Sequence, residues 1–547
     1  MNVETAWVTP PHAIGGLDHL GTQAPCVLIY SQLLPGITNV TDRARYYSFY
    51  PWLVWSFERR YPNAGLDAFV EFYRRADCLF TLIAERHARA TDRDDERHGA
   101  AMVGRIQLTQ ALDRLDAGTP LRLSHYTASD SEHRYFKNQL GGLGQYYAGT
   151  LADLQLMDPS SKPWMQFTFE RGQPIAEGLD RSVPGDELWK VVDKDEVTLA
   201  DLDGLAAFCP CHLKNAGDER QSLTDIFLDR RHEYEGEGDQ RRKSLGLILH
   251  LADSLRRLEG PDLSELVFRA CVYSGSLPGQ EKWVVPESLR GTRECWSLYQ
   301  RNDLLSVACQ TVLAVGLREL QPHHAAPARP PSVEAFARSL SLSAVGAKVC
   351  AAMQAESFGE LVARLAADGP PRDNWEQQNH EVSLVEQLIV GWNRNESTVE
   401  LLEGAIRVLA LLASRDNQQA SPYGTLAIPP EALSDYPINL ASFRERCVRW
   451  RPQAVSAFLA DLIQWCLNTH LRVALRKLRQ TGRSTFHLRP SERGLEVVGE
   501  IPPPAHTVPR FRQAVQILRD IGALSRNADR TTMPSEMGTT LLEEACV

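Results

Sequence analysis

The residues of this sequence best suited to chemistry are arginines gathered toward its C-terminal end. Between residues 441 and 530, sixteen Arg or Lys stand against seven Asp or Glu, although the whole chain has a formal net charge of −10. A guanidinium group binds phosphate oxygens two at a time, and a basic segment on an acidic chain is typical of one polyanion-binding region. The segment therefore predicts contact with nucleic acid through the phosphate backbone.

Two acidic stretches that also carry histidine have the residue types of a hydrolytic site, residues 92–98 and 229–235. Metal-assisted cleavage needs carboxylates that converge from separate elements, whereas here they are consecutive, as on a solvated face. The phosphate-binding GxxxxGK[ST], HExxH and GxSxG motifs are absent, and no strand is followed by GxGxxG. We predict no catalytic residue and no cofactor. A metal-dependent nuclease or other hydrolase using Asp94, Asp95 or Glu235 stays as a second alternative.

The cluster Cys209-Pro210-Cys211-His212 offers three metal-ligating side chains. Ligands two positions apart do not easily share one tetrahedral ion, so we expect ordinary buried or half-exposed cysteines and no metal site. The eleven cysteines are otherwise scattered singly, which favours reduced thiols and a cytoplasmic location. The sequence shows no secretion signal and no apolar window near the roughly 18 residues of a membrane span, so we expect no membrane partner.

Residues 43–55 mix arginine with aromatic rings, as a platform for stacking single-stranded bases does. Large rings on every side of a helix are more typical of a buried helix, which is what we expect here. Apolar residues spaced by three and four predict helices over 43–60, 67–88, 101–115 and 134–153, with Pro51 kinking or splitting the first. The first forty residues are predicted to be irregular.

The proline-rich segment 321–332 is the clearest linker, because its prolines forbid a helix and favour an extended spacer. We therefore expect a helical N-terminal domain (1–185), a second helical domain (186–320), this linker, a third helical domain (333–470) and a basic C-terminal domain (471–547). Within the last of these, period-two runs over 484–489 and 495–499 predict a hairpin. A helix after Thr507 should stop at Gly522, before a short polar loop and a last helix opening at Gly538.

A helix ending in Leu-x-Asp-Ile-Gly-x-Leu, a polar wing and a helix opening at glycine together resemble the C-terminal half of winged-helix domains. In that superfamily the helix before the wing commonly reads the major groove, and the wing touches the backbone or the minor groove. Carried over to matching positions, the resemblance implies contacts from Arg510, Arg512, Gln513, Gln516 and Arg519 on the helix and from Arg526 and Arg530 in the wing. The predicted nucleic-acid-binding set also includes Arg476, Lys477, Arg479 and Arg483.

A looser copy of this pattern occupies residues 134–180. Residues 151–157 align with 518–524, and the distance from Leu151 to Gly172 is one residue longer than that from Leu518 to Gly538. Both segments therefore look like the same supersecondary unit. The first copy has few basic residues on its helix, which favours a protein-contacting role.

Together these patterns predict a mainly α, multidomain protein of helical blocks with two winged-helix-like α/β units. We expect a non-enzymatic nucleic-acid-binding scaffold or regulatory subunit, with duplex DNA and other protein subunits as partners. In plan it is similar to large accessory subunits of bacterial genome-maintenance or anti-phage (antiviral) defence complexes, and a strong preference for arginine over lysine fits a GC-rich bacterium. The alternative is an assembly subunit whose winged helices only dock other proteins.

Overall fold

A computed structural model describes residues 18–91, 102–116, 118–119, 121–258, 260–322, 329–416, 420–424, 426, 428, 430–527 and 529–546. The protein is mainly helical, as predicted, and within these residues strands occur only as four antiparallel two-stranded pairs. In the described part of the chain no helix combines the length and the apolar character needed to cross a membrane.

The chain divides into two compact units, each assembled from separate segments. Unit 1 comprises Met1–Tyr30, Arg269–Val284 and Glu294–Thr507, and unit 2 comprises Ser31–Phe268, Val285–Arg293 and Val508–Val547. The chain passes between the units five times, and three of these passages lie within helices, α1 (Gln23–Leu33), α12 (Glu265–Ser274) and α13 (Glu287–Leu320). The predicted basic domain at 471–547 is thus divided between the units, whereas the other predicted boundaries stay predictions.

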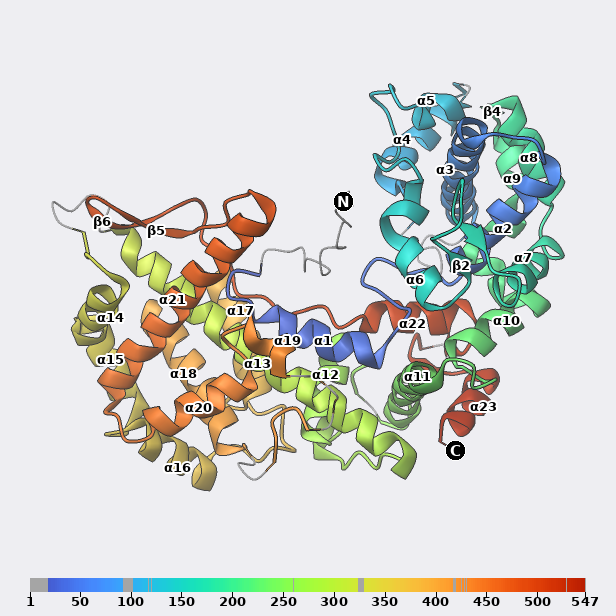
Figure 1. Cartoon of the computed structure of the whole chain (residues 1–547). Coiled ribbons are helices and arrows are strands. Elements are labelled where there is room, and N and C mark those ends of the chain that lie inside the picture. The colour runs from blue at the N-terminus through green and yellow to red at the C-terminus, as the bar shows by residue number, and fades with distance from the viewer. Residues whose placement is uncertain are drawn as a thin grey trace, which may run out of the picture. The chain divides into compact units, whose positions relative to one another are not determined.

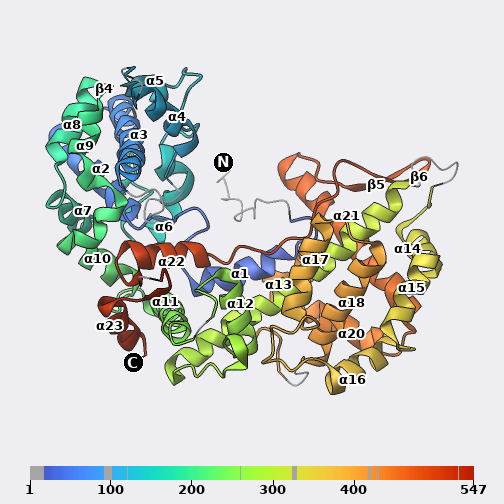
Figure 2. The same cartoon turned by 180° about the vertical axis from the view of Figure 1, so that it is seen from behind.

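Unit 1 is a helical assembly around the longer part of α13. Figures 1 and 2 show α14, α15, α18 and α21 packed together, and α14 and α18 make extensive contacts with α21 and α15 respectively. Its other elements are α14 (Val333–Leu342), α15 (Ala344–Met353), α16 (Phe358–Asp368), α17 (Glu381–Asn393), α18 (Thr398–Ser414), α19 (Pro430–Ser434), α20 (Leu440–Trp450), α21 (Val455–Thr481), β5 (Leu488–Ser491) and β6 (Gly494–Val497).

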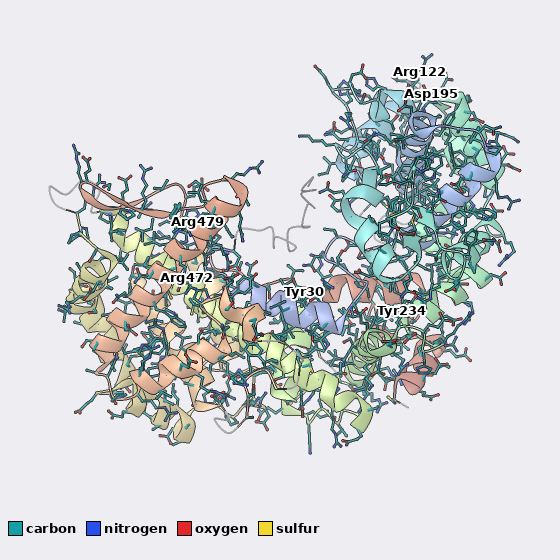
Figure 3. All side chains as sticks on the ribbon, in the orientation of Figure 1. Tyr30, Arg122, Asp195, Tyr234, Arg472 and Arg479 are labelled. Carbon is teal, nitrogen blue, oxygen red and sulfur yellow. The ribbon has the colours of Figure 1, made fainter. Side chains whose placement is uncertain are left out.

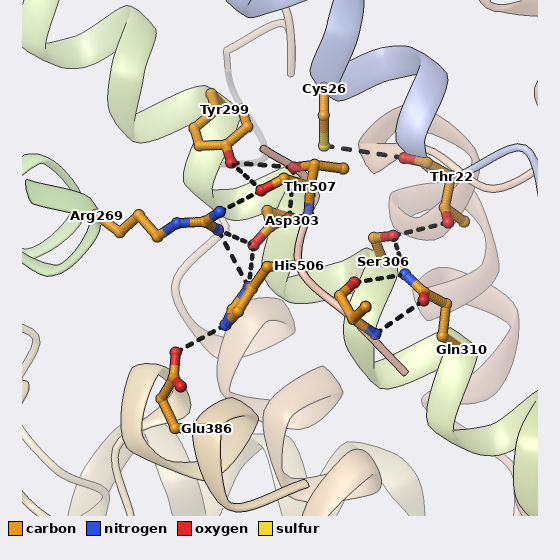
Figure 4. Close-up of polar contacts among 11 residues, drawn as sticks. Thr22, Cys26, Arg269, Tyr299, Asp303, Ser306, Gln310, Glu386, His506 and Thr507 are labelled. Carbon is orange, nitrogen blue, oxygen red and sulfur yellow. Dashed lines mark hydrogen bonds and ion pairs between the residues drawn. The ribbon is translucent and has the colours of Figure 1, made fainter. Parts of the chain in front are cut away.

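A buried polar network fixes α12 and α13 to the segment before residue 508 inside unit 1. Arg269 donates to the carboxylate of Asp303 at 2.6 Å, and the same carboxylate contacts His506 Nδ1 at 2.6 Å and accepts from Thr507 (Figure 4). The other ring nitrogen of His506 lies 2.7 Å from Glu386. Burial alone lowers the pKa of His506, but the Asp303 charge and these hydrogen bonds outweigh it and raise that pKa to about 9.

Unit 2 contains the aromatic helix α2 (Tyr46–Arg60) and the longer helix α3 (Leu66–Ala90). The remaining elements are α4 (Arg105–Asp116), β1 (Leu121–Arg122), α5 (Leu123–Thr127), α6 (Ala148–Asp153), β2 (Met157–Asp158), β3 (Gln166–Phe167), α7 (Gly172–Asp180), α8 (Gly185–Lys194), β4 (Glu196–Val197), α9 (Leu199–Gly204), α10 (Gly217–Phe227), α11 (Glu235–Leu255), α22 (Phe511–Asp520), β7 (Leu524–Arg526), β8 (Thr532–Pro534) and α23 (Glu536–Ala545).

The aromatic helix α2 is buried from Tyr46 to Phe57. This confirms the prediction that the segment is a buried core helix and not a platform for stacking bases. Its rings pack against α3, where Phe49 stacks on Phe80 with centroids 3.9 Å apart. Pro51 lies inside α2 without splitting it. The arginines before the helix are buried too, Arg43 in an ion pair with Asp520 (3.0 Å) and Arg45 in one with Glu219 (2.8 Å). Both pairs lie within unit 2.

Two expectations about individual elements are wrong. Residues 23–33 form α1, because the Asp18 carboxylate accepts the backbone N–H groups of Thr22 and Gln23 at the start of the helix. Residues 134–153 are not one helix. Gly141 has φ 51°, a left-handed conformation that interrupts a helix, so helical structure begins only with a π-helical turn at Leu143–Tyr147 that leads into α6.

The two segments related in sequence share the order helix, hairpin, helix, as α6, β2, β3, α7 and as α22, β7, β8, α23. In the first copy Thr168 donates its backbone N–H to Leu156 and its hydroxyl to Gln155, and it accepts the backbone N–H of Gly172 at 2.9 Å. A Cβ on Gly172 would overlap the Leu156 carbonyl oxygen.

The second copy repeats these contacts at the aligned positions. Ser535 donates its N–H to Ala523 and its hydroxyl to Gly522, and it accepts the N–H of Gly538 at 3.0 Å. A Cβ on Gly538 would overlap the Ala523 carbonyl oxygen. The two segments are therefore the same supersecondary unit in their hydrogen bonding as well as in their sequence.

Candidate nucleic-acid interface

The predicted nucleic-acid-binding residues fall into two groups. Arg476, Lys477, Arg479 and Arg483 belong to unit 1, on α21 or just after it, and the group from Arg510 to Arg530 belongs to unit 2. Each group is described within its own unit.

A row of four arginines lies at the C-terminal end of helix α21. Arg472, Arg476 and Arg479 follow one another on the helix at spacings of four and three, which puts them on one helical face, and Arg483 comes directly after the helix cap. The helix ends at Gly482, whose φ of 69° forms a left-handed cap. We call these four residues the arginine ridge. Basic side chains at this end also complement the helix dipole.

Three members of the arginine ridge are exposed and have no internal partner. The side chains of Arg472, Arg479 and Arg483 make no hydrogen bond or ion pair with any residue that the structure describes, and Figure 3 shows the first two on α21. No Asp or Glu occurs in the sequence from residue 462 to 491. The charge of these arginines is therefore available to a ligand.

Arg476 and Lys477 are instead attached to the rest of unit 1. The Arg476 guanidinium lies over the Tyr436 ring, 4.8 Å from its centroid, and donates to the Asp435 carbonyl. Lys477 donates to the Asp18 carbonyl at 2.6 Å, and burial lowers the pKa of this lysine. These contacts position the helix that carries the exposed arginines.

The buried side of α21 is held by a cluster of neutral histidines. His470 Nε2 accepts the backbone N–H of His487 at 2.9 Å, so its Nδ1 carries the proton and donates to the His19 carbonyl at 3.1 Å. Burial lowers the pKa of His470 to about 4 and that of His19 to about 3. At neutral pH the positive charge on this helix is therefore that of its arginines and Lys477.

The helix expected to read a groove, α22, is mostly packed inside unit 2. Gln513 is buried and donates to the Asn39 carbonyl and to the Asp42 carboxylate at 2.9 Å, and Arg510 donates to the Leu34 carbonyl at 3.0 Å. Gln516 donates to Asp520. The amide and guanidinium groups of these three residues are thus engaged within the protein.

The remaining predicted residues of unit 2 are more accessible. Arg512 is exposed, and Arg519 is half-buried with a hydrogen bond of 3.2 Å to the Thr532 hydroxyl. Arg526 and Arg530 are exposed in the β7–β8 hairpin, although each also interacts within the protein. The hairpin at the wing position therefore presents exposed arginines, but α22 presents fewer accessible polar side chains than the resemblance implies.

Of the two acidic stretches, the structure describes only the second. Residues 92–98, which include Asp94 and Asp95, lie outside the described residues. In the other stretch the Asp229 carboxylate accepts the N–H of Glu233, whose own carboxylate pairs with Arg171 at 3.1 Å. Those groups hold a turn together, and Glu235 begins α11.

One cluster bears on the prediction of ordinary buried cysteines without a metal site, which stays a prediction. The sulfurs of Cys209 and Cys211 lie only 3.4 Å apart, and Cys211 Sγ is also 3.4 Å from Nδ1 of His87 on α3. Within the described residues this is the one group of three or more His, Cys, Asp or Glu whose ligand atoms all gather within 4.8 Å of one another. No sequence pattern points to His87, because it is more than a hundred residues from the cysteines.

No protein-family model matches this chain, and neither a curated protein nor a solved structure is significantly similar to it. Its function therefore has to be inferred from its own residues. Among these, Arg472 is missing from the predicted binding set, although its spacing of four from Arg476 and seven from Arg479 was a usable signal.

Proposed function

We propose that this protein is a non-enzymatic nucleic-acid-binding scaffold or regulatory subunit that holds the phosphate backbone of duplex DNA against the arginine ridge of α21. The observation that supports this most directly is the row of exposed guanidinium groups without internal partners, in a stretch of chain free of carboxylates. Carboxylates nearby would neutralise such a row, as they do for many other arginines of this protein.

The dimensions of the arginine ridge suit a phosphate backbone. Arg472 and Arg479, the two exposed members on the helix itself, are seven residues apart, which at 1.5 Å per helical residue is roughly 10 Å along the axis. That length corresponds to about three nucleotide steps of 3.4 Å. The contact we propose is electrostatic and reads no base sequence, so its affinity falls steeply as salt rises.

The test compares two triple variants that remove the same charge. Arg472, Arg479 and Arg483 are changed to Gln in one, and Arg338, Arg394 and Arg449, exposed arginines elsewhere in unit 1, are changed to Gln in the other. Binding of a labelled DNA duplex is followed by fluorescence anisotropy across a salt series. We expect the first variant to bind on the order of tenfold to a hundredfold more weakly, with a salt slope smaller by about 0.9 for each phosphate that it no longer neutralises.

The control variant should bind within experimental error of the wild type. The proposal fails if the wild type shows no salt-sensitive affinity for duplex, or if both variants weaken to the same extent. Changing Arg512, Arg526 and Arg530 to Gln measures any contribution from unit 2, and weaker binding in that variant alone would move the interface there.

A second candidate function, docking of an acidic protein partner, is supported by Leu475 and Leu478. These side chains are 42% and 36% exposed beside the arginine ridge, and apolar exposure of this kind favours a protein surface over a phosphate backbone. Changing both leucines to Gln separates the two functions. DNA affinity should be unchanged under our proposal, whereas loss of a stoichiometric protein partner would favour the assembly role.

A further inference from the structure

The end of helix α3 lies against a short turn that carries two cysteines. His87 is in the last turn of α3, and Cys209 and Cys211 flank Pro210 at the start of a 3-10 turn, Pro210–Asn215. The backbone N–H of His212 donates to the Cys209 carbonyl at 2.9 Å and so closes the turn. This closure brings the two sulfur atoms to the same side, with His87 Nδ1 against the second of them.

We propose that His87, Cys209 and Cys211 bind a Zn²⁺ ion. Two thiolates and one imidazole are ligands that zinc prefers, and soft sulfur donors select it over magnesium or calcium. At Zn–S and Zn–N distances near 2.3 and 2.05 Å, tetrahedral geometry separates two sulfurs by roughly 3.8 Å and a sulfur from a nitrogen by roughly 3.6 Å. The two shortest distances here are both 3.4 Å, so those two pairs need to move apart by only a few tenths of an ångström. The third pair, Cys209 Sγ and His87 Nδ1, is within 4.8 Å and has to close by about 1 Å.

The surroundings hold the ligands in place. Arg45 has no exposed surface, and its Nη1 donates to the Ala207 carbonyl at 2.5 Å and to the Cys209 carbonyl at 2.8 Å. Glu219 accepts from the other side of the same guanidinium, at 2.8 Å from Nη2. A fully paired arginine thus fixes the backbone of the first cysteine, as the supporting groups of metal sites do.

A second arginine fixes the histidine side. Arg86, the neighbour of His87, makes two parallel hydrogen bonds of 2.8 and 3.0 Å to Asp203 on α9. Helix α3 packs along α9 and along the 3-10 turn Ala206–Phe208 that leads into the cysteines. The bound ion would therefore join elements that already touch, as a structural zinc does.

Three protein ligands leave a fourth tetrahedral position for a water molecule or for His212. The rings of His212 and His87 meet edge to face with centroids 4.8 Å apart. His212 also lines a cavity of about 460 Å³, together with Arg45 and Arg181. Solvent therefore reaches the ring of His212, the side chain that could supply the fourth ligand.

The first test is the metal content of the full chain, purified under reducing conditions without a metal-affinity column. Mass spectrometry of the digested protein should find stoichiometric zinc in the wild type and in Cys546→Ser, a half-exposed cysteine of the same unit. Zinc should be absent from Cys211→Ser and from His87→Ala. A zinc-free wild type that takes up neither Zn²⁺ nor Co²⁺ after reduction would overturn the proposal.

Cobalt substitution gives a second readout that does not depend on how stable a variant is. The wild type with Co²⁺ should show visible absorption of a tetrahedral site and a thiolate charge-transfer band, whereas Cys211→Ser, which has lost one of the two thiolates and no longer retains the ion, should show neither. An unchanged spectrum in Cys211→Ser contradicts the assignment. So does a thiol titration showing that Cys209 and Cys211 are joined as a disulfide.

Discussion

At the scale of single residues, the distinguishing feature of this protein is a set of arginines that are buried together with a carboxylate partner. Arg43, Arg45 and Arg269 all have fully buried carboxylate partners. Removing one member of such a pair leaves a charge in the interior without compensation, which costs far more than the pair itself contributes. These residues should therefore be far less tolerant of change than exposed arginines.

The Arg43–Asp520 pair gives the clearest prediction. Asp520→Asn should lower the free energy of unfolding by about 3 to 5 kcal/mol, because it leaves Arg43 buried without its counter-charge. The measurement is urea denaturation followed by circular dichroism. Asp186→Asn is the matched control, since Asp186 forms an exposed pair with Arg60 at 3.5 Å, and its urea midpoint should stay at the wild-type value. Equal midpoints for the two variants would show that the buried pair carries no stability.

His506 predicts loss of stability in alkaline solution. Its pKa is about 9 in the folded protein against 6.5 for an ordinary histidine, so its contribution is complete below pH 6.5 and disappears as the pH rises through 9. The difference corresponds to about 3 kcal/mol. Urea midpoints between pH 6 and pH 9.5 should fall more for the wild type than for His506→Gln. Parallel curves for the two proteins would contradict a protonated His506.

Residue environments of this kind could mostly not be predicted from the sequence. The arginine surplus could be counted, but whether a given guanidinium is exposed depends on partners far along the chain. Arg510 and Gln513 were expected to contact DNA and instead bind Leu34, Asn39 and Asp42, which are more than 470 residues away. No local pattern encodes such a contact.

At the scale of elements, the spacing of apolar residues predicted the long amphipathic helices correctly. The expected helices at 43–60 and 67–88 correspond to α2 and α3, and the expected hairpin near 484–499 to β5 and β6. The same spacing missed α1, whose first turn is capped by the Asp18 carboxylate. It also predicted a continuous helix across Gly141, where a left-handed backbone conformation interrupts one. The order of the last four elements, α22, β7, β8 and α23, was predicted correctly, but the burial of α22 was not predicted.

The repeated helix–hairpin–helix unit makes a prediction about its two glycines. Gly172→Ala and Gly538→Ala should each destabilise the protein by about 1 to 3 kcal/mol, since a Cβ there meets a carbonyl oxygen that cannot move without opening the turn. Thermal unfolding measures the effect. Gly149→Ala, on the exposed side of α6 with open space around its Cβ, should be neutral or slightly stabilising. A neutral Gly538→Ala would mean that the turn can relax.

At the scale of the whole molecule, the mainly helical class follows from composition and periodicity, but the division into units does not. Each unit is assembled from three separate segments of the chain, whereas a sequence is naturally divided into consecutive blocks. The boundary predicted at the proline-rich segment 321–332 stays a prediction. Part of that segment, 323–328, lies outside the described residues.

All eleven cysteines are unpaired, which gives a prediction for the complete chain. After unfolding in denaturant with a chelator, thiol titration should count eleven reactive groups whether or not a reductant was used. In the native protein Cys350 and Cys546, the two that are half-exposed, should react first. A lower count that rises on reduction would reveal a disulfide.

The pairing of Arg43 with Asp520 has a consequence for synthesis of the chain on the ribosome. The two residues are 477 positions apart, so Arg43 waits until all of the chain between them has been made before its carboxylate is synthesised. The packing of unit 2 around α22 cannot be completed before then, and its earlier segments have to stay soluble, or be protected by chaperones, until that point. A nonsense mutation upstream of Asp520 would consequently damage a part of the protein that was translated much earlier.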